Sequence, residues 1–254
     1  GKIKIGGHTF RITDTSKDTD GRHLQKCEDD IPEDIVGHAA DCSVDTDRRQ
    51  GIECHHTATH LLHWALRETL GTHVRQAGSL VEEGRLWFDF AHFEPVSEKT
   101  LREIEGKTNR CILANASIET VETAFNDKSE DVIAFFGEKY GDRVRVVDIG
   151  GYSKELCGGC HVCSTAELGL FKIVTETGVA AGIRRIEAIA AHPAHALAQD
   201  ALQTIGNLAG LLNCPQTKVE KHLGCLLDER RIMEKQLKVL QQKETVEAAD
   251  SLGD

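Results

Sequence analysis

The sequence has 254 residues, of which 30 are Lys or Arg and 41 are Asp or Glu, so its formal net charge is -11. With 40% apolar residues and only 4 Pro, the composition excludes a disordered or collagen-like chain and allows one large domain or two smaller ones. No apolar run approaches the roughly 18 residues of a membrane-spanning helix, no signal segment opens the chain, and the acidic balance argues against coating nucleic acid by charge alone.

Residues 1–49 predict a small β domain. Apolar and polar residues alternate over short stretches, which are separated by turn signals such as Asp20-Gly21. The acidic stretch at residues 28–34 is then a solvated loop. We predict strands, arranged as a small barrel or meander, at about 2–5, 8–13, 22–27 and 36–45.

Residues 50–191 alternate helical and strand patterns, which predicts an α+β domain. Apolar residues at helical spacing predict a helix at 52–70, which Gly71 ends. Ser97 opens a second helix, which runs to about residue 115. We predict strands at 74–81 and 86–93, joined in a hairpin at 82–84, and near 117–123, 143–149, 168–176 and 182–190.

Residues 192–254 are almost wholly helical in pattern, with a break at residues 213–215. Beyond the break, the apolar residues are alternately four and three residues apart, as in a heptad repeat, and one position of this repeat is polar. This heptad seam consists of Val219, Leu223, Leu226, Arg230, Met233, Leu237 and Leu240. It fits either a helical hairpin or the start of an extension that forms a homodimer or faces tRNA.

The start of the chain and its cysteines predict its context. The chain begins at Gly1 and its one methionine is Met233, so we expect a piece of a longer protein. Nine cysteines, an odd number, occur without a signal segment, which favours a reducing compartment over a disulfide framework. We therefore expect a cytoplasmic protein whose thiols are reactive or bound to metal.

Two short segments carry the residues of a metal site. His56 and His60 are four residues apart on the first predicted helix, so both imidazoles lie on one face and can reach one ion. Cys157 and His161 are separated by three residues, two of them glycines that let the backbone turn sharply. Together they form a His, His, Cys, His set that suits tetrahedral zinc.

Neighbouring residues compete for this role. His55 and His63 belong to the same histidine-rich segment, and His63 shares the helix face of the pair. Cys160 and Cys163 have CxxC-type spacing with Cys157, so the three thiols form a rival ligand set. The HExxH, GxxxxGK[ST], GxGxxG and GxSxG motifs are absent from the sequence, so no motif indicates a zinc protease, a nucleotide site or a serine hydrolase.

Six longer motifs follow one another along the chain. They are HTATHLLH from residue 56, QAGSLV from 76, LWFDFAHF from 86, AFFGEKYGD from 134, ELCGGCH from 155 and GVAAGIRRIEA from 178. Together they resemble the editing domain of alanyl-tRNA synthetases over about residues 1–191, and residues 192–254 resemble the linker helices that follow it. Free-standing alanyl-tRNA editing proteins share the motif, and the threonyl-tRNA synthetase editing domain has a similar HxxxH and CxxxH pair.

The resemblance implies hydrolysis of the ester in tRNA for alanine that is wrongly charged with serine or glycine. It implies that Thr59 and Gln76 line the pocket that distinguishes serine from alanine, and that Cys157 acts in catalysis. A second, hydrolytic site fits the physical problem, because a synthetic pocket cannot strongly exclude a residue that is smaller or merely adds a hydroxyl. The implied zinc ligands are His56, His60, Cys157 and His161.

Contacts to the acceptor end of the tRNA would add to this site. Arg184 and Arg185 follow Gly182, and a turn there can present a guanidinium to a phosphate. Ordinary charges at the end of a surface strand are the alternative. No zone of the chain has more basic than acidic residues, so we expect tRNA to be held at a few points.

The chain departs from the family in two places. The family usually has Thr at the position of Cys160 and a small or polar residue at that of Cys163. A glycine-rich Ser-Gly-Gly-Gln segment, which precedes the editing domain in the family, has no match at Gly6-Gly7. The missing segment and the heptad seam support one alternative, a non-catalytic, zinc-stabilised module for tRNA binding or dimerisation. A threonyl-type editing domain is a second alternative.

Overall fold

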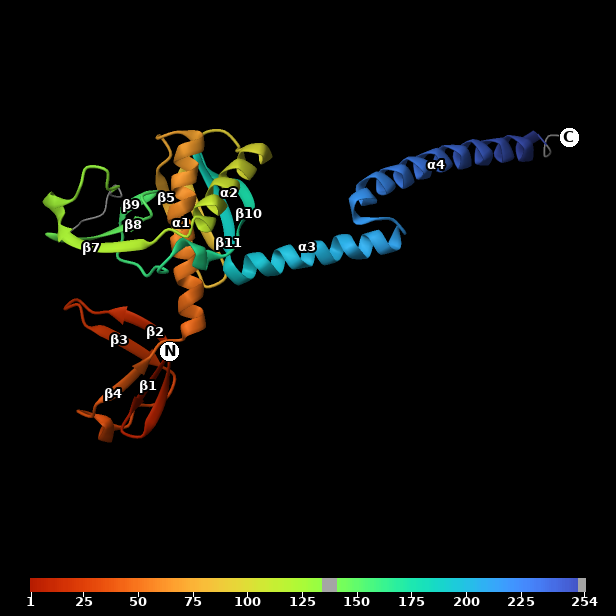
Figure 1. The fold of residues 1–254 in the computed structure, drawn as a ribbon. Helices are drawn as coiled ribbons and strands as arrows, with labels where there is room; N and C mark the ends of the chain where they lie inside the picture. Colours follow the sequence, from red (N-terminus) through yellow and green to blue (C-terminus); the bar gives the residue numbers. More distant parts are fainter. Residues whose placement is uncertain (134–140, 251–254) are drawn as a thin grey trace. The chain divides into compact units, whose positions relative to one another are not determined.

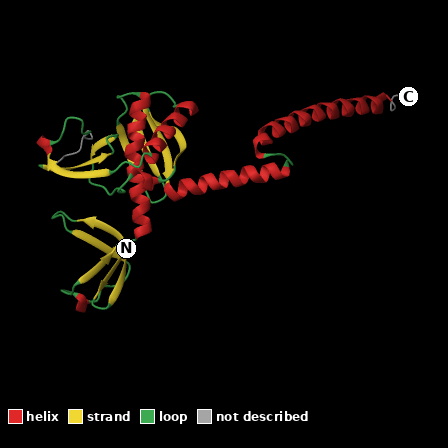
Figure 2. Cartoon of the chain, viewed as in Figure 1, coloured by secondary structure: helices red, strands yellow, loops and turns green. Residues whose placement is uncertain are grey.

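The computed structural model describes residues 1–133 and 141–250, with side chains up to residue 242 (Figure 1). The motif predicted at residues 134–142 therefore lies almost wholly outside the described residues. The chain divides into two compact units, Gly1–His195 and Ala196–Asp254. Helices and mostly antiparallel strands make up the described chain, so the predicted α+β class is confirmed (Figure 2). The division into three domains stays a prediction.

The first strands form a four-stranded antiparallel sheet in the order β3-β2-β1-β4. In chain order they are β1 (Lys2–Ile5), β2 (His8–Lys17), β3 (His23–Cys27) and β4 (Ala40–Ser43), with a short 3-10 turn at Glu33–Ile35. The predicted strands are present, but among the described residues the sheet does not close into a barrel, because β3 and β4 remain its two edges. Its buried apolar side chains are Phe10 and Ile35, so its core is small.

Helix α1 (Thr46–Leu70) follows the first sheet and contributes many side chains to the main core of the first unit. It begins before the predicted residue 52, because Asp45 caps it by accepting a hydrogen bond from the N–H of Arg48 at 3.1 Å. Its first turns are polar and lack apolar periodicity, so the pattern could not reveal them. Further along, the predicted apolar face is fully buried: Ala58, Leu61, Leu62, Ala65 and Leu66.

Helix α2 (Glu98–Leu113) packs beside α1, and two further antiparallel sheets complete the unit (Figure 1). Ser97 caps α2 as predicted, with its hydroxyl accepting from the N–H of Thr100 at 3.2 Å. One sheet has the order β10-β11-β6-β5, with β5 (Gln76–Val81), β6 (Leu86–Ala91), β10 (Phe171–Ala180) and β11 (Ile183–Ala190). The other has the order β7-β8-β9, with β7 (Ile118–Ala124), β8 (Arg143–Ile149) and β9 (Ser153–Leu156).

The second unit contains most of α3 (Ala191–Leu211) and all of α4 (Val219–Asp250). The two helices are present, but they do not bury the heptad seam between them as a packed hairpin would. Its residues Leu223, Leu226, Met233, Leu237 and Leu240 are between 45% and 60% exposed. The homodimer predicted from this seam stays a prediction. No helix in the described ranges combines the length and apolar character that a membrane span requires.

Asn109 joins α2 to the edge strand β10, and this contact gives a test of the fold. Its Nδ2 donates to the carbonyl of Phe171 at 2.9 Å, and its Oδ1 accepts from the N–H of the same residue at 2.9 Å. Asn109→Ala leaves both backbone groups unpaired, so we predict that it lowers the free energy of unfolding by about 1–3 kcal/mol. Urea denaturation measures this loss. Arg102→Ala, an exposed change on the same helix, is the control, and an equal effect of both variants contradicts the prediction.

Candidate metal centre

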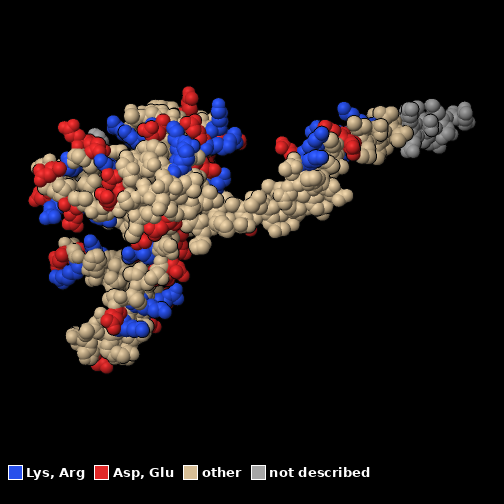
Figure 3. All heavy atoms as spheres, in the orientation of Figure 1, with Lys and Arg blue, Asp and Glu red and all other residues tan. Residues whose placement is uncertain are grey.

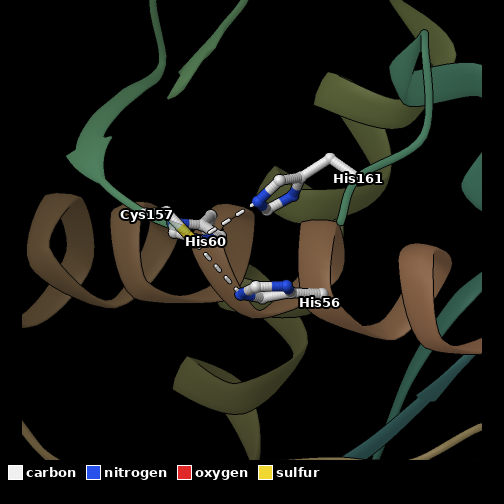
Figure 4. Close-up of side chains that lie close together, drawn as sticks. All are labelled: His56, His60, Cys157 and His161. Atoms are coloured by element: carbon white, nitrogen blue, oxygen red, sulfur yellow. Dashed lines mark hydrogen bonds between the residues drawn. The ribbon is translucent and has the colours of Figure 1, made fainter. Parts of the chain in front are cut away.

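Three histidines and one cysteine converge beside α1 (Figure 4). His56 and His60 lie one turn apart on α1, and Cys157 and His161 lie in the loop that follows β9. Ligand-type atoms of the four side chains lie within 4.8 Å of one another. Sγ of Cys157 is 3.4 Å from Nε2 of His56 and 3.4 Å from Nε2 of His161. Among the side chains that the structure describes, in residues 1–133 and 141–242, this is the only group of three or more that could hold a metal ion.

Each of the three histidines uses Nδ1 for a contact outside this cluster. The partners are the carbonyl oxygen of Cys160 for His56 (3.2 Å), Oγ1 of Thr57 for His161 (3.1 Å) and Oε2 of Glu155 for His60 (2.8 Å). A partner at Nδ1 fixes the ring and leaves Nε2 as the nitrogen that can bind an ion. The surroundings of the cluster therefore hold all three rings in a metal-binding orientation.

Glu155 is a residue of the candidate site that sequence reasoning missed. Its carboxylate is 2% exposed and accepts hydrogen bonds from His60, from Nδ1 of His63 at 3.0 Å and from Oγ of Ser153 at 2.8 Å. Burial alone would raise the pKa of this carboxyl, but the charge and hydrogen bond of His60, followed by those of His63, hold it well below its usual range. The available signal was its position two residues before Cys157, which puts both on one side of an extended chain.

The two competing histidines have other partners. His63 binds Glu155 and stays outside the cluster. His55 spans two elements, since its Nδ1 lies 2.7 Å from the carbonyl of Gly51 and its Nε2 accepts from the N–H of Ala190 at 3.1 Å. Burial lowers the pKa of His55, which keeps it neutral and suits it to a structural role.

The Cys157 thiol is held in its ionised form. Burial disfavours the thiolate, but hydrogen bonds from His161, His56 and His60 outweigh burial and lower the pKa of Cys157 to about 3. Opposing effects also set the pKa of His60. Burial disfavours its charged form, but the charge of Glu155 outweighs burial and raises the pKa of His60 to about 10. A thiolate is the form of cysteine that binds metal.

The rival set of three thiols does not assemble in the part of the chain that the structure describes. Cys160 turns its carbonyl oxygen toward His56, and its thiol is not one of the converging groups. Cys163 is exposed and also lies outside the cluster. The geometry thus brings together the His, His, Cys, His set and leaves the two additional thiols beside it.

A cavity of about 70 Å³ opens beside the cluster. Its lining residues are His56, Thr59, His60, His63, Gln76, Ser79, Phe88, Glu155 and Cys157. Oγ1 of Thr59 donates to the carbonyl of His55 at 2.8 Å, and Nε2 of Gln76 donates to Oγ of Ser79 at 3.1 Å. This volume is small compared with the several hundred Å³ of typical ligand pockets, so the cavity favours a small group. The structure brings Thr59, Gln76 and Cys157 to one cavity, and their catalytic roles stay predictions.

Arg184 and Arg185 are engaged in ion pairs on the sheet that contains β11. Nε and Nη2 of Arg184 bind the carboxylate of Glu176 at 2.5 and 2.7 Å, and those of Arg185 bind Asp89 at 2.6 and 2.8 Å. The Arg185 guanidinium also lies 3.8 Å from the centroid of the Trp87 ring. These contacts support the alternative in which both arginines stabilise the sheet. Their contact with tRNA stays a prediction. Figure 3 shows acidic and basic side chains intermixed on the visible face of the first unit.

Comparisons with known proteins place this site in a family context. Residues 144–187, which include Cys157 and His161, match the family described as the threonyl and alanyl tRNA synthetase second additional domain. Over its whole length, the chain is 46% identical to alanine–tRNA ligase of Opitutus terrae and 43% identical to that of Halorhodospira halophila. It spans 28% and 29% of the length of these two relatives. The resemblance seen in the sequence motifs is confirmed.

Gly159 provides a test of the cluster geometry. A Cβ on Gly159 would overlap the imidazole ring of His56, whereas a Cβ on the neighbouring Gly158 would meet open space. We predict that Gly159→Ala displaces the loop or the ring and lowers the affinity for zinc by about 10–100-fold. Competition against a chromophoric chelator measures the affinity. Gly158→Ala is the matched control and should bind zinc as the unmodified protein does, so equal affinities of the two variants count against this geometry.

Proposed function

Because the chain is related over its whole length to a segment of alanyl-tRNA synthetases, we propose that it is an editing deacylase. Its substrate is tRNA for alanine that carries serine or glycine, and it cleaves the ester bond between the amino acid and the terminal ribose. One observation carries the proposal: three of the four potential metal ligands line one small cavity together with Thr59 and Gln76. The relatives are named for the ligase activity of much longer chains, so the proposal concerns this segment alone.

The donor set fits zinc, with His56, His60, Cys157 and His161 as the ligands. Zinc lies about 2.3 Å from sulfur and about 2.0–2.1 Å from nitrogen, so sulfur and nitrogen ligands in a tetrahedron are about 3.5 Å apart. The two separations from Sγ of Cys157 to histidine Nε2 atoms are both 3.4 Å. Zinc bound there would supply a Lewis acid beside the ester and lower the pKa of a bound water.

Side chains of the cavity would distinguish the amino acid. The Gln76 amide and the hydroxyls of Thr59 and Ser79 are its polar groups next to the cluster. A serine hydroxyl can form additional hydrogen bonds with such groups, whereas the methyl of alanine can form none, so serine would gain about 1 kcal/mol or more relative to alanine. The small volume excludes large amino acids. The chain thus combines a size limit with a polarity test, which suits the removal of serine from tRNA for alanine.

Two other functions compete with this one. A non-catalytic module for tRNA binding or dimerisation is favoured by the exposed heptad seam of α4. A threonyl-type editing domain is compatible with the family description, which includes both synthetases. The alanine–tRNA ligase identities of 43% and 46% along the whole chain favour the alanyl type. Release of serine from charged tRNA separates the editing enzyme from a binding module.

Removal of the thiolate ligand tests the catalytic site. We predict that Cys157→Ala abolishes stoichiometric zinc binding and slows the hydrolysis of serine-charged tRNA by at least about 100-fold, since Lewis-acid stabilisation is worth several kcal/mol. Metal analysis and a deacylation assay measure the two effects. Cys163→Ala, a change at an exposed thiol outside the cluster, should retain both properties. Serine release at full rate after the loss of zinc would refute a catalytic role of the metal.

Loss of the Gln76 amide tests discrimination. We predict that Gln76→Leu slows hydrolysis of serine-charged tRNA by about 10–100-fold, because a serine hydroxyl loses a partner in a confined space. Hydrolysis of glycine-charged tRNA should change less, since glycine has no hydroxyl to pair. Single-turnover deacylation assays give the ratio of the hydrolysis rates of serine-charged and glycine-charged tRNA. Gln203→Leu on α3 is the control, and a proportional loss with both substrates would argue against side-chain recognition by Gln76.

A further inference from the structure

A guanidinium outside the cluster holds the loop that carries Cys157 and His161. Arg145 lies on β8 and is half-buried. Its backbone carbonyl accepts the N–H of Cys157 at 3.0 Å, and its Nη1 donates to the carbonyl of the same cysteine at 3.0 Å. Nη1 also donates to the carbonyl of Gly159 at 2.5 Å, and Nη2 reaches Oγ1 of Thr120 at 3.4 Å. One residue thus binds both backbone groups of the thiolate ligand.

These contacts begin where regular strand pairing stops. The register of β8 and β9 ends at the pair of Val146 with Leu156, and the chain then turns through two glycines. Backbone groups that leave a sheet need other partners, and glycines make the loop entropically costly to order. The side chain of Arg145 supplies these partners for two carbonyls, so it continues the ladder after β9 has ended.

The loop that Arg145 holds also supports the cluster through its backbone. The N–H of Gly159 lies 3.5 Å from Sγ of Cys157, and the carbonyl of Cys160 lies 3.2 Å from Nδ1 of His56. Fixing the carbonyls of Cys157 and Gly159 therefore fixes the groups that orient a thiolate and an imidazole. A loop without this anchor would have to order its glycines when metal binds, which reduces affinity.

We propose that Arg145 is a positioning residue of the metal centre, an inference that rests on the zinc site of the proposed function. It sets the loop so that Cys157 and His161 meet the two histidines of α1, and it touches neither the ion nor the substrate. The planar fork of arginine matters, because it presents several N–H groups in fixed directions, whereas a lysine ammonium acts as a point charge. Lysine should therefore replace it only in part.

The test compares Arg145→Ala and Arg145→Lys with Arg143→Ala. Arg143 is an exposed arginine on the same strand, and its carboxylate partner is Glu122 at 3.7 Å, so it is a matched control. Zinc affinity is measured against a chelator, and Co²⁺ replaces zinc so that thiolate-to-cobalt absorption reports coordination by Cys157. We expect Arg145→Ala to lose about 10–100-fold in affinity and to show a weakened or shifted thiolate band. Arg145→Lys should be intermediate, and Arg143→Ala should match the unmodified protein.

Stability of the metal-free variants separates positioning from folding. If Arg145→Ala fails to fold, Thr120→Val, which removes only the anchor of the guanidinium, should show a smaller change in the same direction. Unchanged affinity and cobalt spectrum in the Arg145 variants would overturn the inference and leave the metal centre intact. A loss of affinity with an unchanged spectrum and lower metal-free stability would overturn it as well. An unmodified protein without thiolate-bound metal would overturn the proposed centre and this inference together.

Discussion

The buried contact that α1 makes with β9 and the loop after it is the constraint on which the site depends. Charged groups in such a place need partners, since desolvation without them costs several kcal/mol. Glu155, with 2% of its surface exposed, provides one by binding His60 and His63 at once. The same pairing aligns the helix with β9. The interaction that makes burial of a carboxylate tolerable therefore also orients a ring of the metal centre.

The sequence predicted the elements whose signals are local. The apolar face of α1 and the Ser97 cap of α2 could be read from spacing and capping chemistry, and both are confirmed. The four-residue strand β9 was missed, because it is too short to show a period. Closure of the first sheet and burial of the heptad seam depend on what each surface packs against, and the pattern of one chain does not contain that information.

The candidate site shows the same division. The spacing of His56 with His60, and of Cys157 with His161, predicted a metal site, and the family resemblance then selected these four residues over the rival ligands. The structure brings the four together. Their supporting partners were not predictable in this way, since Glu155 and Arg145 act through contacts between separate elements. For the arginines after Gly182, the local pattern suggested a contact with phosphate but could not reveal that both arginines form ion pairs within the sheet. Their carboxylate partners, Glu176 and Asp89, come from neighbouring strands.

A zinc ion with four protein ligands usually has a structural role, because no position is left open for a substrate. The position of the cavity suggests how such a site could still act on a substrate. Its lining includes His56, His60 and Cys157, but His161 is not among the residues that line it. A small group in the cavity would thus meet the side of the cluster formed by these three residues. Under the proposed function, Thr59 and Gln76 would hold the amino acid on that side, and the cluster would not have to release His161. The four-residue set is therefore compatible with a role in the reaction as well as with a structural one.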